Sequence, residues 1–277
     1  MPDAFLKSPL ADPKSPLADI QNQADTRNVP LSKVGVKGLE YPIRVLDKVK
    51  KIQYTTATVD LFADLPQHFK GTHMSRFVEI FHCYRDDISM PRFLEMLARV
   101  QQDLEAQSSF GSMTFPYFVE KKAPVSLLPG IVSYQCRYRG RVSKKAGALE
   151  KNFTAAVSVP VNTVCPCSRA ISDRGAHNQR GIVTVELEQG HFFWLEDIIA
   201  LVESAASSPV YSLVKREDEK YITERAYDNP KFVEDLVRDV YVKIRELNQF
   251  PRFSVEAENF ESIHNHSAYA FAEYTRS

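Results

Sequence analysis

The sequence predicts an α+β protein in which an antiparallel sheet carries helices on one face, and in which one order of elements occurs twice. Two observations predict this class. Segments with the two-residue alternation of strands come in pairs, and amphipathic segments with a helical repeat lie between the pairs. The order strand, strand, helix, helix, strand, strand occurs in residues 31–146 and again in 147–277. We therefore expect two modules of one architecture, although the two halves share no obvious sequence identity.

In the first module, alternating apolar residues predict one strand pair before the helices and one after them. Ala57, Val59 and Leu61 fall on one face of their segment, as in a half-buried strand. Both helical segments repeat apolar residues every three or four positions, and Pro91 suits the first turn of the second helix. The predicted strands are 43–50, 52–62, 112–122 and 131–142, and the predicted helices are 74–85 and 91–106.

The second module repeats this order with its own start and stop signals. Pro209 is expected to stop its first helix, and Asp228 or Asn229 to cap the second helix ahead of Pro230. The predicted strands are 153–161, 181–188, 252–260 and 267–275, and the predicted helices are 194–206 and 230–247. Each four-stranded sheet leaves two edges, which proteins usually cover, pair or close into a barrel. We therefore expect oligomerisation through the edges, with pockets where subunits meet.

Composition narrows the class of protein. The chain has 277 residues, 44% of them hydrophobic, and 35 basic residues balance 35 acidic ones, so nucleic acid and acidic membranes are not expected as partners. No apolar run approaches the roughly 20 residues of a membrane span, and the N-terminus lacks a secretory signal. We expect a cytoplasmic protein whose four cysteines are thiols available for metal binding or chemistry.

Residues 1–30 differ from the rest of the chain. The segment KSPLAD occurs at 7–12 and again at 14–19 in a stretch rich in Pro and Asp. Without sustained periodicity, this stretch is expected to be a flexible tail with no assigned chemistry.

The segment NTVCPCSRAISDRGAHNQRG, residues 162–181, is a long connection between two predicted strands and the first candidate for function. Cys165, Cys167 and His177 offer thiolate and imidazole ligands for zinc or a related ion. Because Cys-Pro-Cys is tighter than a zinc knuckle and no second cysteine pair follows, an open catalytic site is favoured over a closed structural one. The alternative is a pair of unligated structural thiols.

Three further segments offer residues that could complete such a site. The charged stretch 215–225 contains Glu217, Asp218 and Glu219, each of which could instead be a surface carboxylate. His264 and His266 follow a predicted strand and would point the same way in an extended segment, or could be solvated turn histidines. Glu234 flanks the apolar stripe of the last helix and could instead pair with Arg238 one turn on.

These motifs together resemble the GTP cyclohydrolase IB family. The resemblance rests on VNTVCPCSRAISDRGAHNQRG, KREDEKYITERAYDNPKFVEDLVRD and ENFESIHNHSAYA in this order, with GTHMSRF and VGVKGLEYPI in the first half, and it covers about residues 20–277. It implies a tunnelling fold (T-fold), with two units of hairpins and helices per subunit. It also implies a homotetramer of barrels with active sites at subunit interfaces.

The resemblance also implies roles for individual residues. Cys165, His177 and Glu219 would hold a catalytic divalent metal ion, zinc or manganese, with iron possible. The residues at the reacting centre would be Cys165, Cys167, His264 and His266, and Glu234 would anchor the guanine base. The implied reaction is hydrolytic opening of the imidazole ring of GTP, which releases formate and forms 7,8-dihydroneopterin triphosphate, the first step of tetrahydrofolate biosynthesis.

The chemistry explains these groups, and three other functions compete. A metal-bound water has a lowered pKa and can add to C8 of guanine at neutral pH, histidines can move protons, and cations are needed for the triphosphate. Candidates for that last role are Arg174, Arg180, Lys215 and Arg216. The alternatives are an archaeal-type cyclohydrolase with iron and a cyclic phosphate product, a T-fold nitrile reductase with a cysteine nucleophile, and a non-enzymatic metal or redox-sensing module.

Overall fold

The computed structural model describes residues 20–21, 23–145 and 147–276 of the chain, and within these ranges the elements follow the doubled order. The strands are β1 (Leu31–Asp47), β2 (Lys51–Leu65), β3 (Ser108–Lys122), β4 (Pro129–Lys145), β5 (Ala148–Val164), β6 (Asn178–Glu188), β7 (Ser208–Pro209), β8 (Arg252–Asn259) and β9 (Ala268–Thr275). The helices are α1 (Met74–Tyr84), α2 (Met90–Asp103), α3 (Pro166–Ile171), α4 (Leu195–Ala205), α5 (Arg216–Asp228) and α6 (Val233–Leu247). Every predicted strand and helix is present.

Packing divides the chain into two compact units that are interleaved in sequence. The first comprises the residues up to 114 together with 138–153, and the second comprises 115–137 and 154–277. The division arises because β3, β4 and β5 each contribute one part to the first unit and one part to the second. The boundary between the modules expected from the sequence, 31–146 and 147–277, falls between β4 and β5. The division into these two modules stays a prediction.

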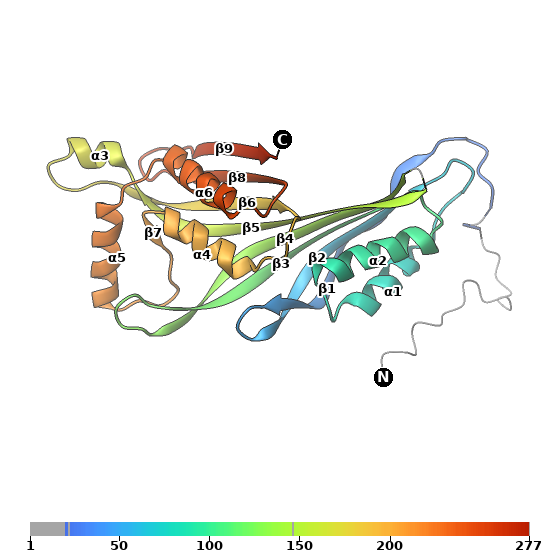
Figure 1. The fold of residues 1–277 in the computed structure, drawn as a ribbon, viewed down its shortest axis with the longest axis horizontal. Helices are drawn as coiled ribbons and strands as arrows, with labels where there is room; N and C mark the ends of the chain where they lie inside the picture. Colours follow the sequence, from blue (N-terminus) through green and yellow to red (C-terminus); the bar gives the residue numbers. More distant parts are fainter. Residues whose placement is uncertain (1–19, 22, 146, 277) are drawn as a thin grey trace. The chain divides into compact units, whose positions relative to one another are not determined.

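In the first unit, helices α1 and α2 lie on one face of an antiparallel sheet (Figure 1). The strand order is β1-β2-β3-β4-β5, and β2 buries Ala57, Val59 and Leu61 as predicted. Helix α2 begins with Pro91 in its first turn and packs closely on the sheet. A Cβ at Gly111 or Gly140 would come within 3 Å of Phe93 and Leu97 of this helix. Glycine at these two positions therefore leaves the space that the Phe93 and Leu97 side chains occupy.

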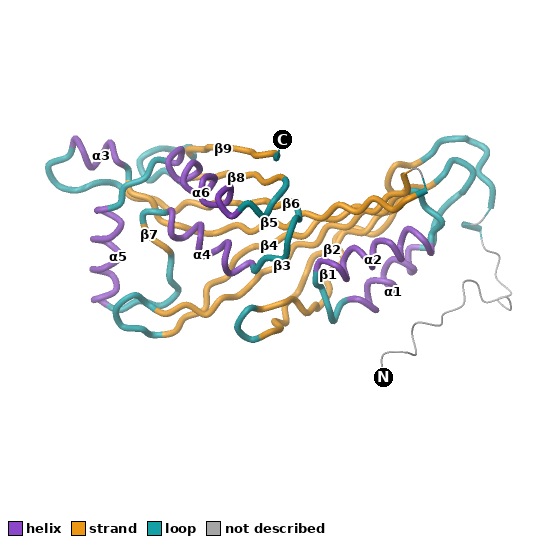
Figure 2. Tube along the Cα trace, viewed as in Figure 1, coloured by secondary structure: helices purple, strands orange, loops and turns teal. Residues whose placement is uncertain are grey.

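The second unit is built in the same way with the order β3-β4-β5-β6-β8-β9, and α6 packs on β8 and β9 (Figure 2). Its core is an apolar layer between sheet and helices. The fully buried members from both sides are Val157, Val159, Val161, Val183, Val185, Leu187, Ile198, Val202, Leu236, Val240, Val255 and Ala257. The predicted fold, an antiparallel sheet with helices on one face, is confirmed.

Three elements of the second unit were not predicted, and one predicted cap is wrong. The connection after β5 contains the short helix α3, β7 pairs with β5, and the charged stretch expected as a connection is helix α5. Helix α6 begins at Val233 with Phe232 at its N-cap, where the Asp235 carboxylate accepts the Phe232 N–H. Asp228 and Asn229 do not cap it, because α5 continues to Asp228 and Asn229 ends that helix.

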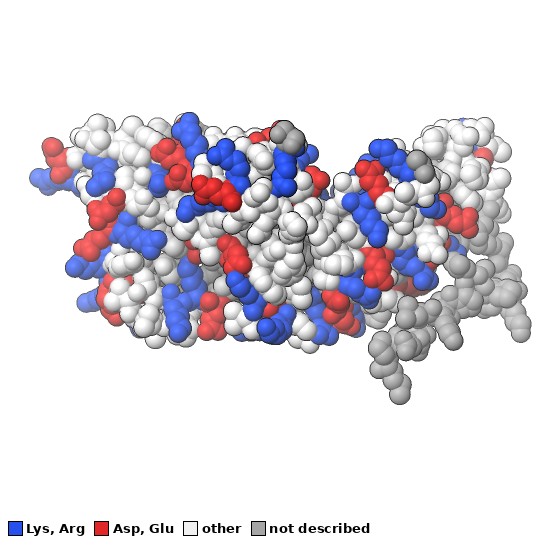
Figure 3. Space-filling model, viewed as in Figure 1, with Lys and Arg blue, Asp and Glu red and all other residues white. Residues whose placement is uncertain are grey.

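Two other expectations concern the ends and the surface of the chain. Residues 1–19, which hold both copies of KSPLAD, lie outside the described residues. The rest of the expected tail contacts the first unit, where Ala24 forms a β-bridge with Phe69 and Gly71 N–H donates to the Gln21 carbonyl. Basic and acidic side chains are interspersed on the face shown in Figure 3. Within the described ranges, no helix has both the length and the apolar composition of a membrane span.

Candidate active site

The connection between β5 and β6, residues 165–177, is called the thiol loop here. A hydrogen bond between its first and last residues closes it. Cys165 is the N-cap residue of α3, and its Sγ accepts the Ser168 N–H at 3.4 Å. The Cys165 N–H donates to the His177 carbonyl at 3.1 Å. Although twelve positions separate them in sequence, the two predicted ligands are thus backbone neighbours, and both are half-buried.

The ring of His177 is oriented by a chain of hydrogen bonds. Its Nδ1 lies 3.0 Å from Oε1 of Gln179, whose Nε2 donates to the Thr163 hydroxyl at 3.0 Å. Because Gln179 is buried and uses its amide nitrogen on Thr163, its oxygen accepts from Nδ1–H. Nε2 of His177 is then the ring nitrogen left for a metal ion. Glu261 Oε2 lies 3.9 Å from the same Nδ1.

The structure separates the roles of the acidic residues at the start of α5. Asp218 is fully buried and accepts hydrogen bonds from Val125 N, Ser126 N, Ser126 Oγ and Lys215 N at 2.6 to 2.9 Å. Its oxygens are therefore occupied in joining α5 to the β3–β4 connection. Glu219, the next residue, is exposed and lines a hollow, so it is the carboxylate available to a ligand.

An open hollow of about 670 Å³ in the second unit joins these segments. We call it the α5 hollow. Its walls are the ends of β5 and β6, the segment after β7, one side of α5 and the segment after β8. The lining residues are Asn162, Asn178, Gln179, Arg180, Pro209, Val210, Tyr211, Val214, Glu219, Ile222, Thr223, Phe260 and Ser262. Gln179 connects the hollow to His177, since it both lines the hollow and orients that ring.

The other predicted residues lie outside the lining of this hollow. Cys167 is exposed on α3. The rings of His264 and His266 stack at a centroid distance of 5.0 Å in the exposed turn between β8 and β9, so the two histidines do lie together. Glu234 is exposed in the first turn of α6, and Arg238 lies nearer to Asp235, at 3.8 Å.

The three predicted ligands are of the chemical types that bind a divalent ion, but the structure does not gather all three side chains at one point. Cys165 and His177 supply a thiolate and an imidazole from one loop, which are ligands that zinc prefers. In the described part of the chain, no three His, Cys, Asp or Glu side chains gather closely enough to hold a metal ion. The first two predicted ligands are thus backbone neighbours, and among the described residues they form no cluster of three with Glu219.

Sequence reasoning did not single out Gln179, Glu261 or Thr163. Gln179 stands two residues after His177 in a strand, so the alternation of strand side chains was the available signal for it. Glu261 lies between a predicted strand and the two histidines, where only its position in the motif could have indicated it. Thr163 carried no signal, because its role depends on the pairing of β5 with β6.

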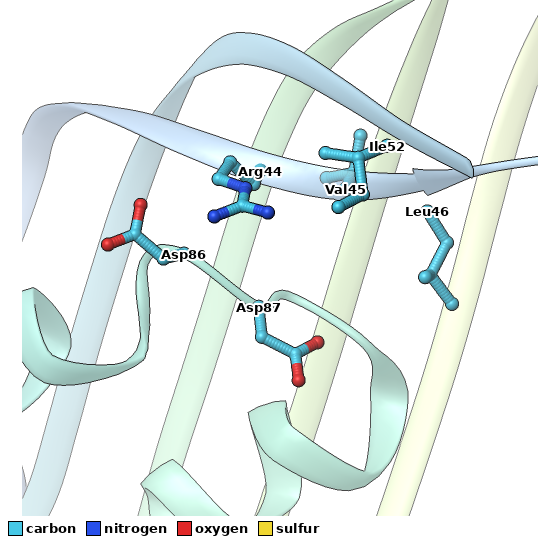
Figure 4. Close-up of a pocket in the computed structure, with 6 residues that line it drawn as sticks. All are labelled: Arg44, Val45, Leu46, Ile52, Asp86 and Asp87. Carbon is cyan, nitrogen blue, oxygen red and sulfur yellow. The ribbon is translucent and has the colours of Figure 1, made fainter. Parts of the chain in front are cut away.

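A second hollow, of about 280 Å³, lies in the first unit. Figure 4 shows the Arg44 side chain between β1 and the connection that carries Asp86 and Asp87. The two aspartates are 3.8 and 3.7 Å from Arg85 and Arg92. This hollow contains no cysteine or histidine, and the candidate active site is accordingly the α5 hollow with the thiol loop.

Comparison with known proteins identifies relatives over almost the full chain. The family model described as type I GTP cyclohydrolase folE2 matches residues 17–270. A GTP cyclohydrolase FolE2 of Geotalea uraniireducens is 51% identical over 93% of both chains. One from Syntrophotalea carbinolica is 52% identical over 93% of this chain and 95% of its own.

Uricases are among the solved structures with a similar fold. The uricase of Arthrobacter globiformis aligns with a TM-score of 0.51 over 88% of this chain and 93% of its own, at 8% identity. A uricase from Bacillus fastidious aligns with a TM-score of 0.55 over 88% and 92%, at 6% identity. At such low identity the likeness supports the T-fold and carries no argument about substrate.

Proposed function

Since this chain belongs to the FolE2 family of type I GTP cyclohydrolases, we propose that it holds a catalytic divalent metal ion with Cys165, His177 and Glu219. It is a hydrolase that opens the imidazole ring of GTP. The products are formate and 7,8-dihydroneopterin triphosphate, and the reaction is the first step of tetrahydrofolate biosynthesis. The type IB assignment is part of the proposal and is supported by the order of the three motifs that contain these ligands.

The proposal is supported most strongly by the geometry around His177. Its backbone carbonyl accepts from Cys165, and Gln179 leaves its Nε2 free while also lining the α5 hollow with Glu219. A divalent ion bound here would supply an acidified water for addition at C8 of guanine. Zinc and manganese both suit a site of one thiolate, one imidazole and one carboxylate, and iron is also compatible.

Protons must move during ring opening, and His264 and His266 are the proposed carriers. Their rings are stacked and exposed to solvent, and an imidazole can both accept and donate a proton. Cys167 is proposed to line the reacting centre with them, since it follows Cys165 on α3. Because these residues lie outside the lining of the α5 hollow, we propose that a second subunit completes the site in a homotetramer.

Recognition of GTP is assigned to Glu234 and to cations. A glutamate that accepts from N1–H and the exocyclic amino group of guanine gives a fork that adenine cannot match. Among the four cationic candidates for the triphosphate, Arg180 lines the hollow, and this favours it over Arg174, Lys215 and Arg216. We assign the protein to the cytoplasm, where GTP is available.

The direct test is to incubate the purified protein with GTP, with and without a chelator, and to measure formate and pterin triphosphate. Product in the metal-replete sample and its loss on chelation are expected. No product in the metal-replete sample would end the proposal. The family match does not support the nitrile reductase or the metal or redox-sensing module, and a cyclic phosphate product would instead indicate the archaeal-type enzyme.

A further inference from the structure

A half-buried lysine lies behind the wall of the α5 hollow. Lys121 stands near the end of β3, and its Nζ is 2.7 Å from Oε1 of Glu203 and 3.0 Å from the Val210 carbonyl. The side chains of Lys121 and Glu203 are 16% and 12% exposed. Burial lowers the pKa of Lys121, and the Glu203 carboxylate opposes that shift. An ammonium group that is kept in such a position at a desolvation cost calls for a structural or functional reason.

The carboxylate of this pair is fixed by a second donor. The Tyr134 hydroxyl donates to the same oxygen of Glu203 at 2.8 Å, and burial together with that carboxylate raises the pKa of Tyr134 far above its usual value. Tyr134 is thus a neutral donor at neutral pH. Glu203 and Tyr134 therefore help to fix the position of the Lys121 ammonium group, and neither of them lines the hollow.

Both further contacts of Lys121 are residues that line the hollow. Besides the Val210 carbonyl, its Nζ lies 4.4 Å from the ring centroid of Tyr211, within the range of a cation–π interaction. Val210 and Tyr211 are consecutive residues of the lining, in the segment between β7 and α5. The ammonium lies over one face of the ring, so Lys121 leaves the opposite face uncovered in a residue that lines the hollow.

We propose that Tyr211 forms the aromatic wall on which the purine base of the nucleotide stacks, and that Lys121, held by Glu203, is the positioning residue for this wall. The inference rests on the proposed function, because it takes a purine nucleotide as the occupant of the hollow. Bases stack on aromatic side chains through their faces without needing a hydrogen-bond pattern. Tyr211 would therefore contribute to affinity, while discrimination between guanine and adenine stays with Glu234.

Two substitutions at the wall separate the ring from its hydroxyl. Tyr211→Phe keeps the stacking surface, and its Kd for GTP is expected to stay within about twofold of wild type. Tyr211→Leu removes the ring and is expected to raise that Kd about tenfold. Tyr221→Leu is the matched control, because Tyr221 is a partly exposed tyrosine of α5 outside the lining of the hollow. The Kd is measured by calorimetry with GTP and chelator-treated protein, so that no turnover occurs.

The positioning role is tested with Lys121→Met/Glu203→Gln. Replacing Lys121 alone would leave the half-buried Glu203 carboxylate without its cation and destabilise the protein. The double variant removes both charges and keeps an acceptor for Tyr134. We expect an unfolding midpoint close to that of wild type and a Kd for GTP raised about fivefold. KM should rise in parallel with Kd, while kcat stays within about threefold of the wild-type value. A merely structural pair would change the midpoint and leave Kd and KM alone.

The outcomes distinguish this inference from the proposed function. If wild-type protein converts GTP and both Tyr211→Leu and the folded double variant bind GTP within twofold of wild type, the inference is overturned while the function stands. If wild-type protein with metal does not convert GTP, the proposed function fails first. If Tyr211→Leu and Tyr221→Leu raise the Kd equally, the inference is also contradicted, because the loss of affinity would not be specific to a residue that lines the hollow.

Discussion

Glu219 and Asp218 are adjacent carboxylates for which the structure predicts opposite effects of the same chemical change. Glu219→Gln alters an exposed side chain on the wall of the α5 hollow, so the free energy of unfolding is expected to change by no more than about 0.5 kcal/mol. If Glu219 is one of three metal ligands, the affinity for zinc falls by about 100-fold or more, which corresponds to about 2.7 kcal/mol. Ring opening of GTP falls with it.

Asp218→Asn is expected to do the reverse. The carboxylate accepts from Val125, Ser126 and Lys215, and an amide in its place turns a donor toward groups that are themselves donors. The unfolding midpoint is therefore expected to drop by several degrees, while metal affinity per folded molecule changes little. The assays are thermal unfolding of the metal-free protein and competitive zinc titration. Normal zinc affinity in Glu219→Gln, or an unchanged midpoint in Asp218→Asn, would refute the division of roles.

The effect of Asp218→Asn also depends on pH. Burial by itself would raise the pKa of Asp218, but the hydrogen bonds from Ser126, Lys215 and Val125 outweigh it and hold the pKa well below the usual 3.8. Such a carboxylate stabilises the fold above pH 3.8, and this stabilisation is lost as the pH falls through the folded-state pKa. The difference in midpoint between wild type and variant should therefore shrink as the pH is lowered from about 5 to about 2. A difference that stays constant would contradict the assignment.

Three further results are expected. Cys165→Ala should lower zinc affinity about 100-fold or more, measured as bound metal after dialysis, and full occupancy would remove this residue from the ligand set. Gly140→Ala places a Cβ 2.8 Å from a side-chain carbon of α2 and should cost about 1 to 3 kcal/mol in urea unfolding; an unchanged midpoint would show that the contact relaxes. In native protein at about pH 8, alkylation should modify exposed Cys167 and spare Cys136, because Cys136 is fully buried and burial raises its pKa; mass spectrometry of the peptides would show the opposite pattern if the burial were wrong.

The fold was predictable where local pattern and tertiary role agree. Strands such as β2 alternate cleanly because one face is buried, and α2 shows both an apolar stripe and Pro91 at its start. Helix α5 was missed because it has almost no apolar stripe: only Asp218 and Ala226 are buried on it. Its position depends on the Asp218 contacts with the β3–β4 connection, which no periodicity reveals.

The site was predictable as a set of residue types and only partly as a geometry. Cysteine and histidine in a polar loop indicated a ligand pair, and the hydrogen bond from Cys165 to His177 places them side by side. The orientation of His177 by Gln179 depends on the pairing of β5 with β6. The residue pattern alone left Glu217, Asp218 and Glu219 open, and the family resemblance implied Glu219. The burial of Asp218 and the exposure of Glu219 agree with that choice, which stays a prediction.

X-ray absorption spectroscopy of the zinc-loaded protein tests most directly whether thiol, imidazole and carboxylate share one ion. We expect one sulfur at about 2.3 Å with nitrogen and oxygen ligands at about 2.0 to 2.2 Å. The sulfur signal should vanish in Cys165→Ala, and the imidazole signal in His177→Ala. A zinc shell without sulfur in the wild-type protein, or an unchanged shell in both variants, would contradict the account.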